Sequence, residues 1–277
     1  MNAIRNTLFV GKVLNYFEAA DSTNALAVEW LSATQKKRSS NAYSVHKDAH
    51  TVQRTPYGEG TVFYTFNQIA GRGQYGNKWE SEPFRNIAIS IVLSPTFLTA
   101  REQFHLNKAV SLAVCDVVNT CFDNPYYNIT VKWANDIYVL DKKICGILIQ
   151  NALLGNQIQH SIVGIGLNVN QLSFKNLPHA TSLKIETGKE FDLFELVEKL
   201  CQSIEQRYLQ LKVRQFNKLH EEYLSKLYRW GEDAIYQYPD GVYFQGKIVG
   251  VNESGKLMLE SKKGLEEFDI KEIKFVI

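Results

Sequence analysis

The chain has 277 residues, of which 45% are hydrophobic and 22% are charged. This length allows one large domain, or one domain with a small appendage, and the composition is that of a globular protein. With 31 basic and 29 acidic residues the net charge is only +2, which argues against a general nucleic-acid-binding or membrane-binding protein.

The cysteines and the N-terminus indicate a reducing compartment. No C-x-x-C pair and no nearby His cluster exists, so a zinc site is not expected. No apolar run approaches the roughly 18 residues of a membrane helix, and residues 1–6 lack the apolar core of a signal peptide. We therefore expect a cytoplasmic protein with reduced core thiols at Cys115, Cys121, Cys145 and Cys201.

The N-terminal part begins with a capped helix. Leu26 and Trp30 lie four residues apart and predict an amphipathic helix over Ala25–Ser32, capped by Ser22 or Thr23. Residues 35–60 are polar and favour an exposed loop. The basic residues of this segment are Lys36, Lys37, Arg38, His46, Lys47, His50 and Arg54.

A glycine-rich segment, Gly71–Ser81, follows a predicted strand over Thr61–Gln68. Its glycines satisfy G-x-G-x-x-G, the dinucleotide-binding pattern, which requires a helix directly after the loop. Pro83 and the absence of apolar periodicity argue against that helix. The segment instead reads as an anion-binding loop, in which backbone N–H groups and the Arg72 guanidinium face a carboxylate or phosphate.

The middle of the chain predicts strands joined mostly by short turns, which favours antiparallel pairing. The expected strands are Asn86–Leu93, Ile129–Trp133, Ile137–Leu140, Ile144–Gln150 and Ser161–Val169. A helix is expected from Phe104 to about Cys121, and helices dominate from Phe191 to about Arg229.

The composition changes at Gly231, after which no helix is predicted. Short strands separated by hairpin signals indicate a small β-barrel that packs on the main domain. We therefore predict two domains, residues 1–230 and 231–277. The expected strands of the second are Ala234–Tyr238, Val242–Val251, Lys256–Glu260 and Glu266–Phe275.

Polar residues interrupt several apolar strands and are candidates to line a pocket, because a buried polar group is costly unless it is satisfied. Each has an ordinary alternative: a solvated turn for Lys143, a turn for Asn135-Asp136 and a strand edge for Gln68. Three glycines, Gly146, Gly164 and Gly166, could mark bulges. The other polar candidates are Lys132 and Asn168.

Taken in order, these motifs resemble the biotin–protein ligases, the biotin–[acetyl-CoA-carboxylase] ligase and holocarboxylase synthetase family. The matching segments are Asp21–Asn24, Gly71–Gly73 with Trp79 and Ser81, Lys132–Asp136, Lys143–Leu148 and Gly164–Asn168. The resemblance covers roughly residues 8–230, and the expected C-terminal barrel also suits the family.

The resemblance implies an α+β fold: a mixed, largely antiparallel sheet with helices, as in class II synthetases, and a small SH3-like C-terminal barrel. It implies an enzyme that activates biotin with ATP and Mg²⁺ as biotinyl-5′-AMP and transfers biotin to a lysine of a biotin carboxyl carrier protein. It also allows a homodimer. Too few residues precede Asp21 for the DNA-binding domain of some relatives, so we expect no DNA partner, and no membrane partner.

Site residues carry over from the resemblance one by one. Lys143 and Arg72 are the expected catalytic residues, and Asp136 is the expected contact to Mg²⁺ or nucleotide. The expected biotin contacts are Ser22, Thr23, Asn24, Gln68, Arg72, Gly73, Gln74, Lys143 and Gly146. The expected ATP or adenylate contacts are Lys132, Asn135, Asp136, Asn168 and Trp79.

This chain departs from the family pattern at Gln74, where many members have arginine, and at Ala134, where proline is usual. Gln74 keeps hydrogen bonding but loses a charge, so we expect Arg72 and Lys143 to hold the adenylate. Two alternatives stay open. A lipoate–protein ligase shares the adenylation logic, and a non-catalytic biotin- or nucleotide-binding sensor would share the pocket.

Overall fold

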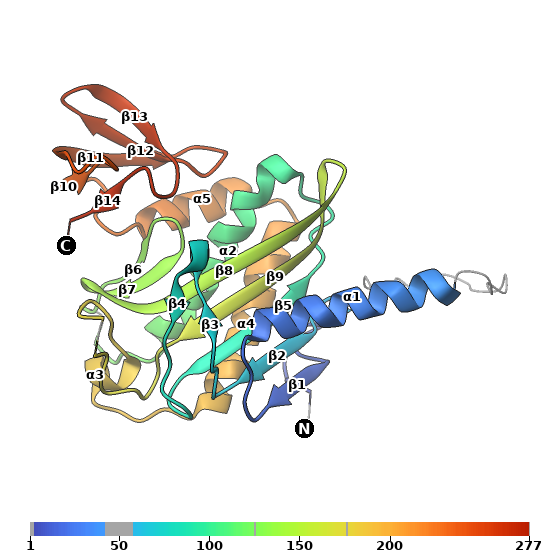
Figure 1. The fold of residues 1–277 in the computed structure, drawn as a ribbon. Helices are drawn as coiled ribbons and strands as arrows, with labels where there is room; N and C mark the ends of the chain where they lie inside the picture. Colours follow the sequence, from blue (N-terminus) through green and yellow to red (C-terminus); the bar gives the residue numbers. More distant parts are fainter. Residues whose placement is uncertain (1–2, 42–57, 125, 176, 277) are drawn as a thin grey trace.

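The computed structural model describes residues 3–41, 58–124, 126–175 and 177–276, and its central element is a seven-stranded sheet (Figure 1). Only β1 and β2 pair in parallel; every other neighbour pair is antiparallel. This arrangement confirms the expected mixed, largely antiparallel sheet. In spatial order the strands are β1 (Leu14–Phe17), β2 (Val62–Thr65), β5 (Ile87–Leu93), β9 (Gln157–Leu167), β8 (Lys142–Leu154), β7 (Asp136–Val139) and β6 (Ile129–Lys132).

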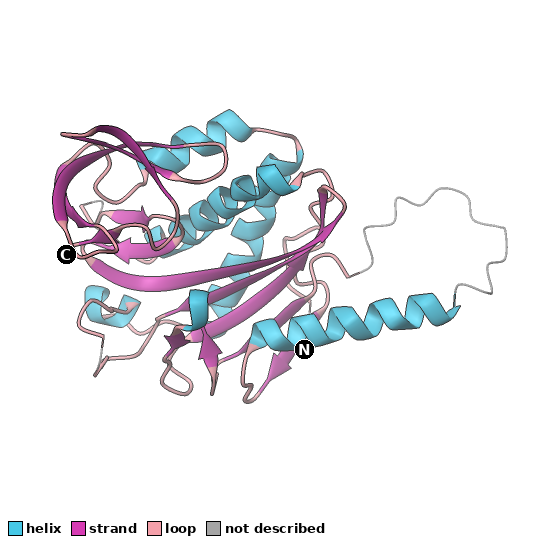
Figure 2. Ribbon diagram, turned by 45° about the horizontal axis from the view of Figure 1, so that its top comes forward, coloured by secondary structure: helices cyan, strands magenta, loops and turns pink. Residues whose placement is uncertain are grey.

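The two faces of the sheet are covered differently (Figures 1 and 2). Three helices, α2 (Gln103–Asn119), α4 (Leu193–Lys212) and α5 (Phe216–Ser225), pack on one face and enclose the main core. Helix α1 (Thr23–Asn41) lies on the other face, over β2, β5 and β9. Because it is covered on both faces, β5 is buried along its whole length, and its sequence is an almost continuous apolar run.

Helix α1 is longer than the sequence pattern predicts. Ser22 caps it, with its Oγ accepting the N–H of Ala25 at 3.4 Å. The expected loop over residues 35–41 is wrong, because this stretch is rich in helix-forming residues and holds neither glycine nor proline, so the helix continues to Asn41. Residues 42–57, which include the other expected basic loop residues, lie outside the described part of the chain.

The C-terminal part is a five-stranded antiparallel sheet in the order β13-β12-β11-β10-β14. It suits the expected SH3-like unit, although within the described residues no pairing of β13 with β14 closes it into a barrel. One expected strand, Glu266–Phe275, is two strands separated by a turn. The bounds are β10 (Asp233–Gln237), β11 (Tyr243–Val251), β12 (Leu257–Ser261), β13 (Gly264–Phe268) and β14 (Lys274–Phe275).

A buried hydrogen bond docks this sheet on the main core. The indole N–H of Trp133 donates to the backbone oxygen of Gly255 at 2.9 Å, and Gly255 packs against the ring of Phe104. Because Gly255 has φ of +93° and a Cβ there would lie 2.4 Å from Phe104, only glycine fits this contact. The turn after β11 is therefore fixed beside the end of β6.

Some short elements have no counterpart in the prediction: β1, the helix α3 (Leu183–Thr187) and the 3₁₀ turn Ala100–Glu102. The four cysteines are free and buried, as expected for core thiols. Among the described residues, no helix has both the length and the apolar character needed to cross a membrane.

Candidate active site

The floor of the site is a row of small residues that crosses three strands. Ala88 of β5 pairs with Gly166 of β9, which pairs with Gly146 of β8. The hydrogen-bond ladders of β9 with β5 and with β8 show no register shift at Gly146, Gly164 or Gly166. The alternative that these three glycines mark β-bulges is therefore excluded. A Cβ added at Gly166 would lie 2.6 Å from the indole of Trp79, and one at Gly146 would lie 2.9 Å from it. The glycines therefore leave room for the indole face to lie across the sheet.

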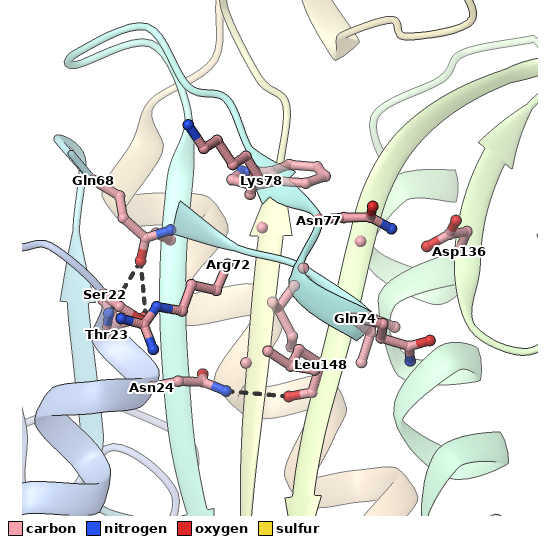
Figure 3. Close-up of a pocket in the computed structure, with 18 of the residues that line it drawn as sticks. Ser22, Thr23, Asn24, Gln68, Arg72, Gln74, Asn77, Lys78, Asp136 and Leu148 are labelled. Carbon is pink, nitrogen blue, oxygen red and sulfur yellow. Dashed lines mark hydrogen bonds between the residues drawn. The ribbon is translucent and has the colours of Figure 1, made fainter. Parts of the chain in front are cut away.

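The roof is the glycine-rich segment, which forms a hairpin of β3 (Gly71–Arg72) and β4 (Lys78–Trp79) with a 3₁₀ turn at Gln74–Gly76. Extended strand follows the turn, so the expected absence of a dinucleotide-binding helix is confirmed. Hairpin and floor enclose a cavity of about 250 Å³ (Figure 3). All nine expected biotin contacts line it: Ser22, Thr23, Asn24, Gln68, Arg72, Gly73, Gln74, Lys143 and Gly146.

One end of this cavity is a polar corner, formed by Ser22, Thr23 and Asn24 at the start of α1. Gln68 Oε1 accepts the backbone N–H of Thr23 at 3.0 Å, which ties the corner to the strand before the hairpin. Asn24 Nδ2 donates to Gln150 Oε1 at 3.1 Å. In Figure 3 the Arg72 side chain extends from the hairpin toward this corner.

The other end carries an ion pair. Lys143 Nζ lies 2.7 Å from Asp136 Oδ1 and 5.7 Å from the centre of the Trp79 ring. The backbone of Lys143 is fixed on both sides, because its N–H donates to His179 and its carbonyl accepts from Thr181. A solvated turn at Lys143 is therefore excluded, since its side chain is only 31% exposed and faces the cavity.

A second cavity, of about 210 Å³, begins where the first ends. Trp79, Lys143 and Lys78 border both. Asn168 lines the second cavity; its Nδ2 donates to the Thr181 carbonyl, and its Oδ1 has no partner within the described residues. A mostly apolar part of its lining comes from the segment before α3 and consists of Phe174, Leu177, Pro178, His179 and Ala180.

Two expected nucleotide contacts, Lys132 and Asn135, line neither cavity. Each instead forms a hydrogen bond to a residue that lines one of the cavities. Lys132 Nζ donates to the hydroxyl of Tyr138, which borders the second cavity, and burial lowers the pKa of the Lys132 ammonium. Asn135 Oδ1 accepts from Gln74 Nε2 at 3.4 Å. Their role in nucleotide binding stays a prediction.

Several lining residues had no signal in the sequence. Asn77 and Lys78 come from the hairpin, whereas Ile270 and Lys271 come from the turn between β13 and β14. Nothing in residues 269–271 distinguishes them from an ordinary surface turn. Their place at the first cavity depends on how the C-terminal sheet docks, which local patterns do not encode.

Comparison with known proteins agrees with this geometry. The model of the biotin/lipoate A/B protein ligase family matches residues 32–168. A solved biotin protein ligase from Aquifex aeolicus, in complex with biotin and ATP, superposes with a TM-score of 0.70 at 25% identity, covering 96% of this chain and 100% of that one. Residues 32–168 therefore contain a biotin/lipoate protein ligase family domain.

Curated relatives within the family carry ligase names. The chain is 29% identical over 213 residues to the biotin–[acetyl-CoA-carboxylase] ligase of Paracoccus denitrificans, covering 75% of this chain and 87% of the relative. It is 28% identical over 231 residues to the bifunctional ligase/repressor BirA of Bacillus subtilis, covering 81% of this chain and 69% of BirA. The family resemblance inferred from the ordered motifs is confirmed.

Proposed function

We propose that this chain is an ATP-dependent biotin–protein ligase. A carboxylate oxygen of biotin attacks the α-phosphorus of ATP, the bond to the bridging oxygen breaks, and pyrophosphate leaves biotinyl-5′-AMP behind. The ε-amine of a lysine on a biotin carboxyl carrier protein then attacks the mixed anhydride and loses a proton. AMP departs, and an amide joins biotin to the carrier.

The observation that carries this proposal is the junction of the two cavities. Trp79 and Lys143 belong to both walls, so a ligand in the first cavity and a nucleotide in the second would meet beside the same ammonium group. The reaction brings a carboxylate against a polyanion, and a fixed cation offsets that repulsion and stabilises the charge that develops. Lys143 is positioned for this role by its backbone bonds to residues 179 and 181.

The polar corner favours biotin over lipoate as the acid. A ureido ring presents one carbonyl and two N–H groups, which hydroxyl and amide side chains can satisfy. The dithiolane of lipoate has no N–H group and only weakly accepting sulfurs. Placing it against Ser22, Thr23 and Asn24 would displace water without giving the hydrogen-bonding positions that face the ligand a new partner, at a cost of roughly 1–3 kcal/mol each.

Magnesium fits the site as a companion of the nucleotide. The described residues hold no cluster of three or more His, Cys, Asp or Glu side chains. Mg²⁺ is commonly bound by one or two carboxylates together with substrate phosphates, and Asp136 would be that carboxylate. Bound in this way, the ion would screen the phosphate charge. Lys143, which now pairs with Asp136, would then face the biotin carboxylate.

The remaining parts of the proposal concern organisation. The free, buried cysteines support a cytoplasmic location, where thiols stay reduced. Residues 1–230 are proposed as the catalytic domain and 231–277 as the SH3-like unit, whose turn at Ile270 and Lys271 reaches the first cavity. A homodimer is a separate proposal, which sedimentation analysis of the purified chain would test.

The test is biotin-dependent exchange of labelled pyrophosphate into ATP. Wild type should exchange with biotin and not with lipoate, and Lys143→Gln should lose roughly 100- to 1,000-fold in rate. Lys142→Gln is the matched control, because Lys142 is the neighbouring lysine, half exposed, and pairs with Glu186 at 3.6 Å; it should behave as wild type. Exchange with lipoate alone would indicate a lipoate ligase, and binding without any exchange would indicate a sensor.

A further inference from the structure

We propose that Ser90 is a positioning residue that sets the hydrogen-bond polarity of the biotin corner, so that Thr23 and Asn24 present only acceptors to the ligand. This inference deepens the proposed function and rests on it. Ser90 lies on β5, is fully buried and lines neither cavity. It therefore acts on the ligand through the two residues above it.

The geometry around Ser90 is close. Its Oγ lies 2.7 Å from Thr23 Oγ1 and 2.6 Å from Asn24 Oδ1. Both separations are those of O–H···O hydrogen bonds. Asn24 fits here because its partner across the sheet surface is glycine: a Cβ at Gly164 would lie 2.1 Å from Asn24 Oδ1.

The orientation of the Asn24 amide is decided by its other neighbour. A backbone carbonyl only accepts, and the carbonyl of Leu148 lies 3.4 Å from Asn24 Nδ2. The amide nitrogen must therefore face Leu148 and Gln150, and the amide oxygen must face Ser90. Figure 3 shows the Asn24–Leu148 contact.

Counting hydrogens then fixes the remaining bonds. A serine hydroxyl carries one hydrogen, and an amide oxygen carries none, so the Ser90 hydrogen goes to Asn24. The 2.7 Å contact between Ser90 and Thr23 then needs the hydrogen of Thr23. A competing bond from Thr23 to Gln68 Oε1 is much longer, at 3.5 Å, and that oxygen already accepts the Thr23 backbone N–H.

The consequence is a corner with two acceptors facing the ligand. The Thr23 hydroxyl donates its only hydrogen to Ser90, so toward the ligand its oxygen can only accept a hydrogen bond. Asn24 Oδ1 accepts from Ser90 with one lone pair and can accept from the ligand with the other. Such acceptors can take the hydrogen of a ureido N–H group but cannot donate to the ureido carbonyl, so they fix which edge of the ring faces this corner. Ser22, whose Oγ accepts from Ala25, keeps its own hydrogen for the ureido carbonyl.

Removing the Ser90 hydroxyl should abolish the fixed hydrogen-bond direction of Thr23 and Asn24. In Ser90→Ala the Thr23 hydroxyl is free to turn, and the Asn24 oxygen loses a buried donor. Biotin affinity should fall about tenfold, as for one lost hydrogen bond to a positioned group. The KM for biotin should rise by the same factor, while kcat at saturating biotin and the KM for ATP stay at wild-type values.

The decisive readout is discrimination between ligands, measured by calorimetry with biotin, desthiobiotin and biotin methylated on one ureido nitrogen. Wild type should bind the methylated compound at least about 100-fold more weakly than biotin, since an acceptor is left unpaired and crowded. In Ser90→Ala that ratio should shrink to below about tenfold. The desthiobiotin-to-biotin ratio, which involves no ureido change, should be the same in both proteins.

Ser161→Ala is the matched control. Ser161 is also fully buried in this sheet, on β9, and donates to an asparagine oxygen, that of Asn151, at 2.7 Å, but it does not line the first cavity. It should keep wild-type ratios. Ser90→Cys, which replaces the hydroxyl with a weaker donor, should give intermediate values and serves if the alanine variant folds poorly.

The outcomes separate this inference from the function on which it rests. If wild type binds biotin and Ser90→Ala keeps the full penalty for methylation, the role of Ser90 is refuted and the ligase function stands. Equal effects in Ser161→Ala would likewise refute it, as a general consequence of weakening the sheet. Wild-type protein that does not bind biotin at all would overturn the proposed function itself.

Discussion

Gly166→Ala tests whether the indole of Trp79 must lie on the sheet for the site to work. The added Cβ would lie 2.6 Å from Cε2 and 2.7 Å from Nε1 of Trp79. Carbon atoms in contact are about 3.5–4.0 Å apart, so the ring must rise by roughly 1 Å. The movement falls on the hairpin, because Trp79 belongs to the short strand β4 whereas Gly166 is paired on both sides.

The expected loss follows from that displacement. A misplacement of about 1 Å near the reacting groups costs on the order of 100-fold in rate, which corresponds to about 2.7 kcal/mol of transition-state stabilisation. The free energy of unfolding should change little. Alanine in a strand is favoured over glycine by roughly 0.5–1 kcal/mol, and this gain offsets the weakened packing of the Trp79 ring on the sheet. Gly146→Ala should cost less, since its Cβ would come no closer than 2.9 Å to the ring.

The assay is kcat/KM for biotin in pyrophosphate exchange, paired with thermal unfolding. A second measurement in the Trp79→Phe background completes a double-mutant cycle, in which the smaller ring should make Gly166→Ala clearly less costly. Gly250→Ala, facing the flexible thioether of Met258 at 3.2 Å, is the control for a strand glycine outside the site. Full activity of Gly166→Ala, or equal losses in both backgrounds, would refute the reasoning.

Two further predictions concern the fold. Trp133→Phe removes the donor to the buried Gly255 carbonyl and should lower the unfolding free energy by about 1–3 kcal/mol, measured by chemical denaturation. His105, stacked on Phe216 at 4.1 Å, has its pKa lowered by burial from 6.5 to about 4. Because the unfolded chain takes up this proton first, stability should fall as the pH drops from about 6.5 to about 4, by less than about 1.4 kcal/mol per pH unit. His105→Gln should flatten that part of the stability curve.

Each of these has its own check. Trp230→Phe alters a tryptophan that is 37% exposed and should leave stability almost unchanged; a loss as large as that of Trp133→Phe would contradict the docking role of the indole. For His105, neighbouring charges act in both directions, and identical pH curves for wild type and His105→Gln would show that its burial does not control acid stability. The charged neighbours are Lys108, Glu102, His220 and Arg214.

Local patterns predicted most of the regular elements because burial imposes a period on the sequence. The expected strand Asn86–Leu93 and the helix from Phe104 match β5 and α2 closely. Patterns failed where a polar stretch is compatible with either state: residues 35–41 carry no apolar period that would distinguish a helix from a loop. The strand β1 also escaped, since a short edge strand of four half-buried residues has no clear alternation.

The site was predictable to the extent that its residues sit in recognisable motifs. Ordered motifs placed the nine expected biotin contacts, and all of them line one cavity. The motifs did not distinguish residues that line a cavity from residues that only contact the lining, such as Lys132 and Asn135. Strand period alone cannot make that distinction, because both kinds of residue interrupt an apolar run.

By itself, the sequence indicated the family resemblance, the largely antiparallel sheet and the identity of the polar and charged residues that the chemistry requires. Only the tertiary structure decided that the row from Ala88 to Gly146 forms a floor for Trp79, and that Ser90 lies beneath Thr23 and Asn24. The physical reason is that a hydrogen bond or a ring contact depends on which strands become neighbours. Apart from the β8–β9 hairpin, which joins Gly146 to Gly166, these contacts join segments more than 60 residues apart, and no local pattern encodes them.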